Sequence, residues 1–586
     1  MDADGNFDVL VLGTGLTESI TAAALSKAGF KVVHLDVNPY YGADEASLTL
    51  DELARWADSR AHPDPADPNP SPYLLSQRET FKAIHRSLVI PEHARHYSVS
   101  LSPSLLTSVG PLITSLVSSG VSRYGGYRLL ERVGIYDREV GIRSVPASKE
   151  DIFKSQEMTL LEKRRLMRFF MFASSDFEGV KELEGHEETG FVEYLQSVFS
   201  LRAQVSDAIA YALAFCSTAA EPTLPVLQRL RRYLRSSGRY GASPFLVGHY
   251  GGSGEIAQGF CRVSAVNGGV YILDRPIQSI TPPHTQPIAS SPVSEKSLPG
   301  TAPISESKYT IMLKDVPEPL TADIIISSPS QLPPGLRDAA HLVSSTNDSP
   351  GESFARCIAI LDRPIPFPPP PATPDVSSSG DPAKPEGSSD RAASEGEEAA
   401  KPVDTAVLVF PPSSLDGGSS TAAVHAFITG QGTMSAPQGK YILYLSIAFS
   451  NSEKSPESQL KPYLDAILSL ISSSDDGAST AEALFKVFYI QHPHQTPTLA
   501  TTGAEAATAL LIPSVSTALT ETADASSVAA EAVFFKAVEI LKAKHPEAWS
   551  PRDSETKSGS GGDVFEEIAF FPPTEFDDAE DAGEEW

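Results

Sequence analysis

The apolar and polar positions of the first forty residues follow the order strand, helix, strand. Apolar runs at residues 7–12 and 30–36 predict two buried strands. Between them, small and apolar residues recur at helical spacing, which predicts a helix capped by Thr17 and ended by Gly29. A β-α-β unit of this kind is typical of a doubly wound parallel sheet, so we expect an α/β fold.

The spacing of the apolar residues separates the rest of the chain into helical and strand-like regions. Residues 149–238 contain four segments at helical spacing, and residues 100–135 also follow a helical pattern. Short strand patterns return after residue 239, and residues 526–544 predict a final amphipathic helix. We therefore expect a sheet-containing domain I, formed by residues 1–148 and 239–586, with an all-helical domain II of residues 149–238 inserted into it.

Three stretches interrupt these patterns because they are rich in Pro, Ser or Gly and poor in large apolar residues. They are residues 62–72, 283–304 and 367–404, which we interpret as flexible inserts. Residues 551–586 predict an extended acidic tail. The formal net charge of the whole chain is −28, which opposes binding to nucleic acid.

The chain shows few signs of metal, disulfide or catalytic chemistry. Its three cysteines lie far apart, so they predict neither a disulfide framework nor a metal site. No catalytic nucleophile motif is present either. The N-terminus is acidic and leads directly into a strand, unlike a signal peptide, and no apolar run reaches the roughly 18–20 residues of a membrane span. These features favour a cytoplasmic protein.

The first strand is followed by an incomplete dinucleotide-binding loop. Gly13 and Gly15 have the G-x-G spacing, and Asp36 ends the second strand, where an acid would bind a ribose. The position of the third glycine is Glu18, however. Its carboxylate lies in the first turn of the helix and would compete with a pyrophosphate for the same N–H groups. The motif therefore predicts the fold and leaves open whether a cofactor binds.

Two long stretches resemble one known family. "LGTGLTES…HLDVNPYYG" near the N-terminus and "GRYGASPFLVGHYGGSGEIAQGFCRVSAVNGGVYIL" at residues 238–273 are similar to the two signatures of the Rab GDP-dissociation inhibitor and Rab escort protein superfamily. The resemblance implies a flavin-monooxygenase-like fold from which FAD has been lost. It also implies GDP-bound Rab GTPases as partners.

The stretch at residues 143–170, the inserts and the acidic tail look more like the escort branch, of the fungal type. That branch implies a non-catalytic accessory component. It would present unprenylated Rab to the α/β heterodimer of Rab geranylgeranyltransferase and shield the geranylgeranyl lipid during transient contact with membranes. Two alternatives remain open: a Rab GDP-dissociation inhibitor that recycles prenylated Rab, and a flavin-dependent oxidoreductase.

The resemblance also assigns a Rab-binding platform. It comprises Tyr41, Glu255, Gln258, Arg262 and Ile272. Glu255 and Arg262 are seven residues apart, so both can face one side of a helix. The alternative is that these two residues pair with each other inside the fold.

Two further sites follow from the resemblance. Ile358, Ile360 and Leu361 occupy the place of a groove for the Rab C-terminus, and the alternative is an ordinary buried strand. In the helical block, we expect lipid and transferase docking at Phe169, Phe170, Phe172 and Leu195, whereas apolar helix residues more often belong to a core.

Overall fold

The computed structural model describes most of the chain. The described residues are 5–62, 71–144, 158–283, 308–344, 352–369, 402–449, 454–473, 481–494, 508–546 and 568–571. The expected inserts and the acidic tail lie largely outside these residues, as does the first of the two boundaries expected between domains I and II, at residues 148/149. The second expected boundary, at residues 238/239, follows the end of helix α9 at Ser236. Among the described helices, none combines the length and apolarity needed to cross a bilayer.

The first sheet contains the predicted β-α-β unit. Strand β1 (Asn6–Leu12) pairs in parallel with β2 (Val32–Asp36) on one side and with β14 (Leu320–Ser327) on the other. The order of the main path is β11-β2-β1-β14-β13-β12, and β21 and β15 complete the eight strands. The added strands are β11 (Val270–Leu273), β12 (Ile277–Thr281), β13 (Tyr309–Leu313), β15 (His341–Leu342) and β21 (Ala509–Leu511).

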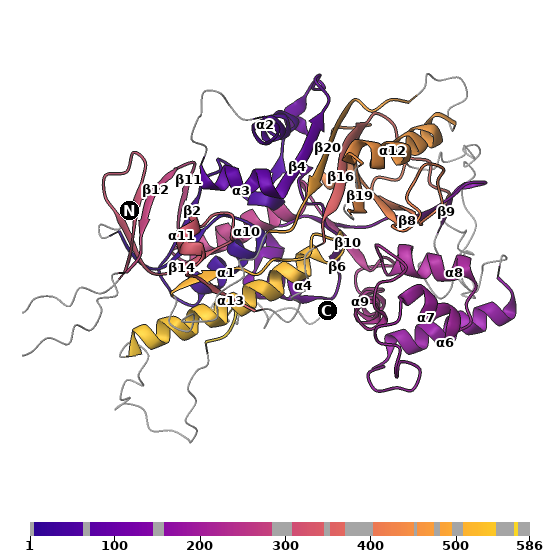
Figure 1. Ribbon diagram of the computed structural model, residues 1–586, viewed down its shortest axis with the longest axis horizontal. Coiled ribbons are helices and arrows are strands. Elements are labelled where there is room, and N and C mark those ends of the chain that lie inside the picture. The colour runs from indigo at the N-terminus through magenta and orange to yellow at the C-terminus, as the bar shows by residue number, and fades with distance from the viewer. Residues whose placement is uncertain are drawn as a thin grey trace, which may run out of the picture.

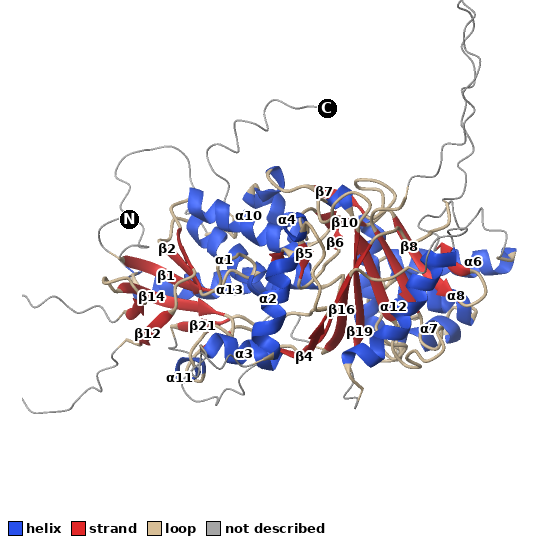
Figure 2. Ribbon diagram, turned by 90° about the horizontal axis from the view of Figure 1, so that it is seen from above, coloured by secondary structure: helices blue, strands red, loops and turns tan. Residues whose placement is uncertain are grey.

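Helices cover one face of this sheet (Figure 2). Helix α1 (Leu16–Lys27) packs between the sheet and two later helices, α10 (Ser253–Val266) and α13 (Thr522–Lys544). The predicted cap of α1 is wrong: the helix begins after Gly15, and the side chain of Thr17 is buried within the first turn. The segment Ile568–Phe571 returns to this core, where Phe571 stacks on Phe260 of α10 with ring centres 6.0 Å apart.

A second eight-stranded sheet, which the sequence did not distinguish from the first, has the order β4-β20-β16-β19-β18-β17-β8-β9. Its strand β16 (Phe354–Leu361) is buried along its whole length. Alternate residues of β16 face helix α12 (Pro456–Ser473) or the opposite core. The other strands are β4 (Phe81–Arg86), β8 (Arg132–Asp137), β9 (Gly141–Ser144), β17 (Ala406–Phe410), β18 (Val424–Thr429), β19 (Tyr441–Ala448) and β20 (Phe485–Gln491).

The helical block lies at one end of the molecule, on the side of the second sheet opposite α12 (Figure 1). Its first helix, α6 (Leu160–Ser174), begins with a capping box in which Thr159 and Glu162 bond each other's backbone N–H groups. The helices expected here are present. They are α7 (Phe191–Ser197), α8 (Ala203–Asp207), which continues as a π-helix at Ala208–Leu213, and α9 (Thr223–Ser236).

Shorter elements join the two sheets. The helical pattern expected at residues 100–135 is mostly wrong, since the only α-helix there is α4 (Pro111–Ser119) and short strands occupy much of the rest. Those strands are stabilised by pairing with distant segments, which local periodicity does not reveal. The remaining elements are α2 (Leu50–Ala61), α3 (Pro72–Thr80), α11 (Pro334–Arg337), β3 (Ser47–Leu48), β5 (Val99–Ser100), β6 (Leu106–Thr107), β7 (Tyr127–Leu129) and β10 (Phe245–Gly248).

Candidate partner-binding site

Helix α10 presents a polar side to solvent. Its apolar residues are buried against α1, whereas Gln258 and Arg262 are exposed and Glu255 is half-buried. The guanidinium of Arg262 lies 4.4 Å from the ring centre of Tyr124, a cation–π distance. In the described part of the chain no ion pair joins Glu255 to Arg262. The mutual pair considered from the sequence is therefore not formed, and both side chains remain on one accessible side.

Sequence reasoning missed the aromatic neighbours of this helix. Tyr124 is 56% exposed, and it lines a small pocket beside Glu255 together with Tyr127 and His249. A Cβ on Gly125 would lie 2.5 Å from Tyr127 Oη, so this close packing requires glycine. Burial raises the pKa of Glu255 and raises that of Tyr127 to about 12. The Y-G-G-Y run at residues 124–127 was the available signal.

Tyr41 lies in the turn that packs against the start of α10. Gly42 has φ +99°, and a Cβ on it would lie 3.1 Å from the Cα of Gly254 and closer still to Ala46. The half-buried ring of Tyr41 meets that of Tyr271 edge-on, with centres 6.3 Å apart. Burial raises the pKa of Tyr41. The turn thus places an aromatic side chain beside the polar helix.

Ile272, the remaining platform residue, lies elsewhere. It is the neighbour of Tyr271 on β11, and successive side chains of a strand point to opposite faces. It packs with the core on the face of the sheet away from α10. The structure therefore brings together four of the five expected platform residues around α10 and separates Ile272 from them.

Asp36 and the glycine loop form a closed hydrogen-bond system. Both carboxylate oxygens of Asp36 accept hydrogen bonds, from the backbone N–H and hydroxyl of Thr14 at 2.8 and 2.6 Å and from the backbone N–H and side-chain amide of Asn38 at 2.8 and 2.9 Å. Asp36 is 2% exposed. Its carboxylate therefore orders the loop around Gly13 and Gly15.

Two further carboxyl groups cover the N-terminus of α1. Glu45 accepts a hydrogen bond from the N–H of Leu16 at 3.3 Å, and Glu18 bonds its own backbone N–H. A Cβ on Gly15 would lie 2.5 Å from Glu18 Oε2, so the Glu18 carboxyl group lies directly over the glycine loop. Burial raises the pKa of Glu18 to about 7 and that of Glu45 to about 8.

His494 connects this cluster to the second sheet. It follows β20, and its Nε2 lies 2.7 Å from Asp44 in the turn that carries Tyr41. The hydrogen bond from His494 lowers the pKa of Asp44, and Asp44 raises the pKa of His494, in each case against the effect of burial. Gln77 also donates to Asp44, at 2.7 Å. His494 and Gln77 therefore hold the turn through Asp44, in addition to the bond between Glu45 and the N–H of Leu16.

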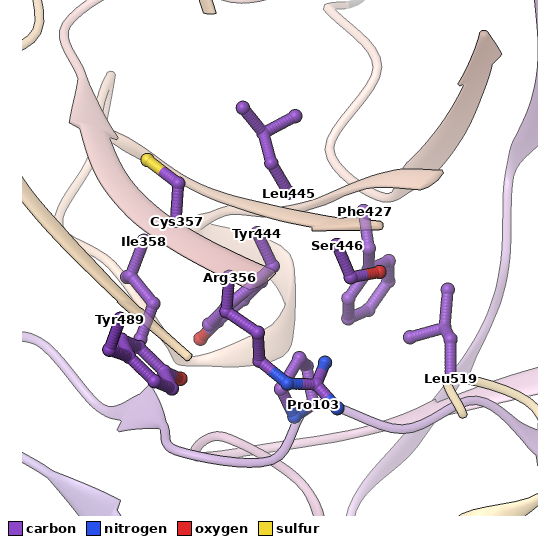
Figure 3. A pocket seen from close by; sticks show the side chains of 10 residues that line it. All are labelled: Pro103, Arg356, Cys357, Ile358, Phe427, Tyr444, Leu445, Ser446, Tyr489 and Leu519. Carbon is purple, nitrogen blue, oxygen red and sulfur yellow. The ribbon is translucent and has the colours of Figure 1, made fainter. Parts of the chain in front are cut away.

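The residues expected to form a groove for a C-terminal peptide are buried. Ile358, Ile360 and Leu361 on β16 are each at most 1% exposed. Of the three, Ile358 lines a small cavity. Figure 3 shows its lining, with Ile358, Tyr444 and Tyr489 on neighbouring strands and Arg356 pointing across it. In this conformation β16 is an ordinary buried core strand, which was the alternative interpretation of the sequence.

Most of the docking residues expected in the helical block are also buried. Phe169 and Leu195 are fully buried, and Phe170 is 9% exposed, so all three pack in the core of the block. Phe172 is half-buried, in contact with Phe177 and Phe199. Beside it, Met171 is 66% exposed on the outer side of α6. Of the four expected docking residues, only Phe172 reaches the surface.

The model of the family described as GDP dissociation inhibitor matches residues 1–69 and 74–288, which include the glycine loop, the Tyr41 turn and α10. Residues 1–288 of the chain, apart from residues 70–73, are therefore similar to this family. The resemblance stated from the two signatures is thereby confirmed, and the matched range extends through the helical block.

The names of the relatives that the chain resembles agree with the escort branch. The chain is 37% identical over 297 residues to "Rab proteins geranylgeranyltransferase component A" of Drosophila melanogaster, covering 48% of this chain and 55% of that protein. Its identity to the protein of the same name in Saccharomyces cerevisiae is 28% over 488 residues, 82% of this chain and 68% of that one. The match thus spans about half of the fly relative's length.

A solved structure supports the fold. The crystal structure of a Rab GDI from Plasmodium falciparum superposes with a TM-score of 0.56 at 19% identity, covering 93% of this chain and 98% of that one. The α/β fold expected from the sequence, with a parallel sheet and a helical part, is confirmed. Among the described residues, no group of three or more His, Cys, Asp or Glu side chains could hold a metal ion.

Proposed function

We propose that this chain is a non-catalytic escort component that binds GDP-bound Rab GTPases and presents them to the α/β heterodimer of Rab geranylgeranyltransferase. The observation that carries the proposal is the accessible polar side of α10, with Glu255, Gln258 and Arg262 beside the Tyr41 turn, inside the range matched by the family model. A rigid aromatic and a planar guanidinium are typical anchors of a protein interface. The names of the fly and yeast relatives support the link to the transferase.

We also propose that the chain holds no FAD. A dinucleotide needs free N–H groups at the start of α1 and a free acid at the end of β2. Glu45 and Glu18 bond the N–H groups of Leu16 and Glu18, and the oxygens of Asp36 are bonded to Thr14 and Asn38. The residues present do not fit a pyrophosphate. A yellow purified protein with near-stoichiometric flavin would revive the oxidoreductase alternative.

The decisive experiment is a prenylation assay. Rab in its GDP form, the transferase and geranylgeranyl diphosphate are incubated with and without this chain, and lipid incorporation is followed over time. We expect fast modification only when the chain is present. Equal rates with and without it would refute the escort function. Arg262→Ala should reduce the rate at limiting Rab, while Arg55→Ala, at an exposed arginine on α2, should not.

The inhibitor alternative shares the platform, so platform variants do not separate the two functions. Unprenylated Rab does. An escort protein binds it and forms a ternary complex with the transferase, which gel filtration detects as co-elution of all components. An inhibitor prefers prenylated Rab and elutes apart from the transferase.

We place transferase docking on the outer side of α6 around Phe172. The support is its surface position next to Met171 and exposed Arg168. Shielding of the geranylgeranyl lipid and transient contact with membranes belong to the same proposal. Since Phe169, Phe170 and Leu195 are core residues in this conformation, lipid binding at them requires the helices of the block to separate.

A further inference from the structure

A row of polar side chains crosses the second sheet on the face turned toward the helical block. Arg356 of β16 is directly opposite Ser446 of β19 and Tyr489 of β20. Ser446 in turn is opposite His425 of β18. All four lie on the same face, because directly opposite residues of paired strands point the same way. Most of the surrounding residues of this face are apolar core residues, so the row is an exception that needs a physical explanation.

Of the four residues of this row, only Arg356 is charged at every accessible pH, because an arginine guanidinium is not deprotonated in proteins. The residue is 3% exposed. Its Nε donates to Gln491 Oε1 and its Nη2 donates to the carbonyl of Thr517, both at 2.6 Å. These partners are neutral. Within the described residues, no aspartate or glutamate forms an ion pair with Arg356.

A buried charge is stable only when a charge of opposite sign or a full set of hydrogen bonds compensates it. Two of the five guanidinium N–H groups have acceptors in the described chain. Arg356 lines the cavity shown in Figure 3 together with Ser446, which lies directly opposite it on the neighbouring strand. The other polar groups there are already engaged: Tyr489 donates to Leu101, and Tyr444 accepts from Ser100.

The cavity restricts what can compensate the charge. The space open inside it is about 10 Å³, the size of one water molecule or one small ion, and its walls are otherwise apolar, with Pro103, Ile358, Phe427 and Leu519 among them. A nucleotide or a multivalent phosphate is too large and carries too many charges for these walls. A single negative charge on a small ion or a carboxylate matches one guanidinium and one hydroxyl.

We propose that Arg356 and Ser446 form a buried site for a small monovalent anion, between the second sheet and the segments that contain Pro103 and Leu519. The guanidinium supplies the charge and the Ser446 hydroxyl supplies a further donor. Occupancy stabilises the junction of these segments with the sheet. The site is separate from the α10 surface, because none of its residues lies there.

Thermal unfolding tests the proposal with named ions. The full chain is melted in sodium chloride, sodium formate and sodium gluconate at equal ionic strength, gluconate being too large for the cavity. We expect the melting temperature to rise saturably by about 1–3 °C in chloride, formate or both, relative to gluconate. A response to chloride identifies an inorganic ion as sufficient, and a response to formate alone identifies a carboxylate. Equal melting in all three salts overturns the proposal.

Variants locate the effect. Arg356→Met should abolish the ion dependence, and Ser446→Ala should weaken the apparent ion affinity several-fold while the protein stays folded. Arg164→Met, on the exposed side of α6, is the matched control and should keep the wild-type response. If Arg356→Met does not fold, bromide-soaked crystals of the wild-type chain supply the second measurement. An anomalous peak beside Arg356 together with the melting response supports the site, and a melting response that Ser446→Ala leaves unchanged overturns it.

Discussion

Replacing Glu18 with glutamine should make the protein less sensitive to pH. Burial raises the pKa of Glu18 from 4.5 to about 7, with nearby Asp44 and Asp36 adding to the increase. Between these pH values the folded chain keeps a proton that the unfolded chain releases, so the free energy of unfolding falls as pH rises. One pKa unit corresponds to about 1.36 kcal/mol, so the loss at pH 8 is on the order of 3 kcal/mol.

Glutamine has nearly the same shape as a protonated glutamic acid and does not titrate. Glu18→Gln should therefore equal the wild type in stability near pH 5 and exceed it increasingly up to pH 8, by a few kcal/mol. Glu45, whose pKa burial raises to about 8, contributes a loss of the same sign at higher pH, so some pH dependence should persist in the variant.

Urea denaturation at pH 5, 6, 7 and 8 measures the difference. Glu531→Gln, on the exposed side of α13, is the matched control and should follow the wild type at every pH. A stability difference between Glu18→Gln and the wild type that stays constant over this range would refute the reasoning. It would mean that the Glu18 carboxyl group is solvated and does not cover the helix N-terminus.

Three further predictions concern the platform and the helical block. Arg262→Ala should weaken binding to GDP-bound Rab about tenfold or more, because it removes the stacked guanidinium; calorimetric titration against an Arg164→Ala control measures this. His494→Ala should lower the free energy of unfolding by about 3 kcal/mol at pH 6, since Asp44 loses its partner, and by less at pH 8, because the raised pKa of His494 stabilises the fold only while it is protonated. Phe169→Ala should cost about 3–5 kcal/mol in urea denaturation, whereas Phe172→Ala should cost less and weaken co-elution with the transferase.

The first β-α-β unit and the helical block could be predicted from the sequence because their apolar residues repeat at the period of the element they form. Strands β1 and β2 lie within one residue or two of the predicted runs, and α13 includes the whole predicted final helix. The platform residues on α10 could be named from the family signature, and their common side followed from the helical repeat.

Long-range pairing accounts for what the sequence did not predict. Strands β8 and β17 are paired although more than 260 residues separate them, so the pairing of strands in the second sheet leaves no local signal. The same holds for Ile272: its position on β11 was predicted, but its face depends on the pairing of β11 with β2. Apolar residues such as Phe169 and Leu195 fit either a lipid-binding groove or a core, and only their burial in the structure shows that they belong to the core.

The carboxyl groups at the start of α1 connect the glycine loop to the platform. Glu45 lies four residues after Tyr41, in the short helix Ala43–Glu45, and it accepts the N–H of Leu16. In the same turn, the N–H of Gly42 donates to the backbone carbonyl and to the hydroxyl of Thr14. The helix N-terminus that would bind a phosphate in a dinucleotide enzyme therefore binds the turn that carries Tyr41. A glutamate at the third glycine position is compatible with this arrangement, because the space over Gly15 receives side chains of the protein itself.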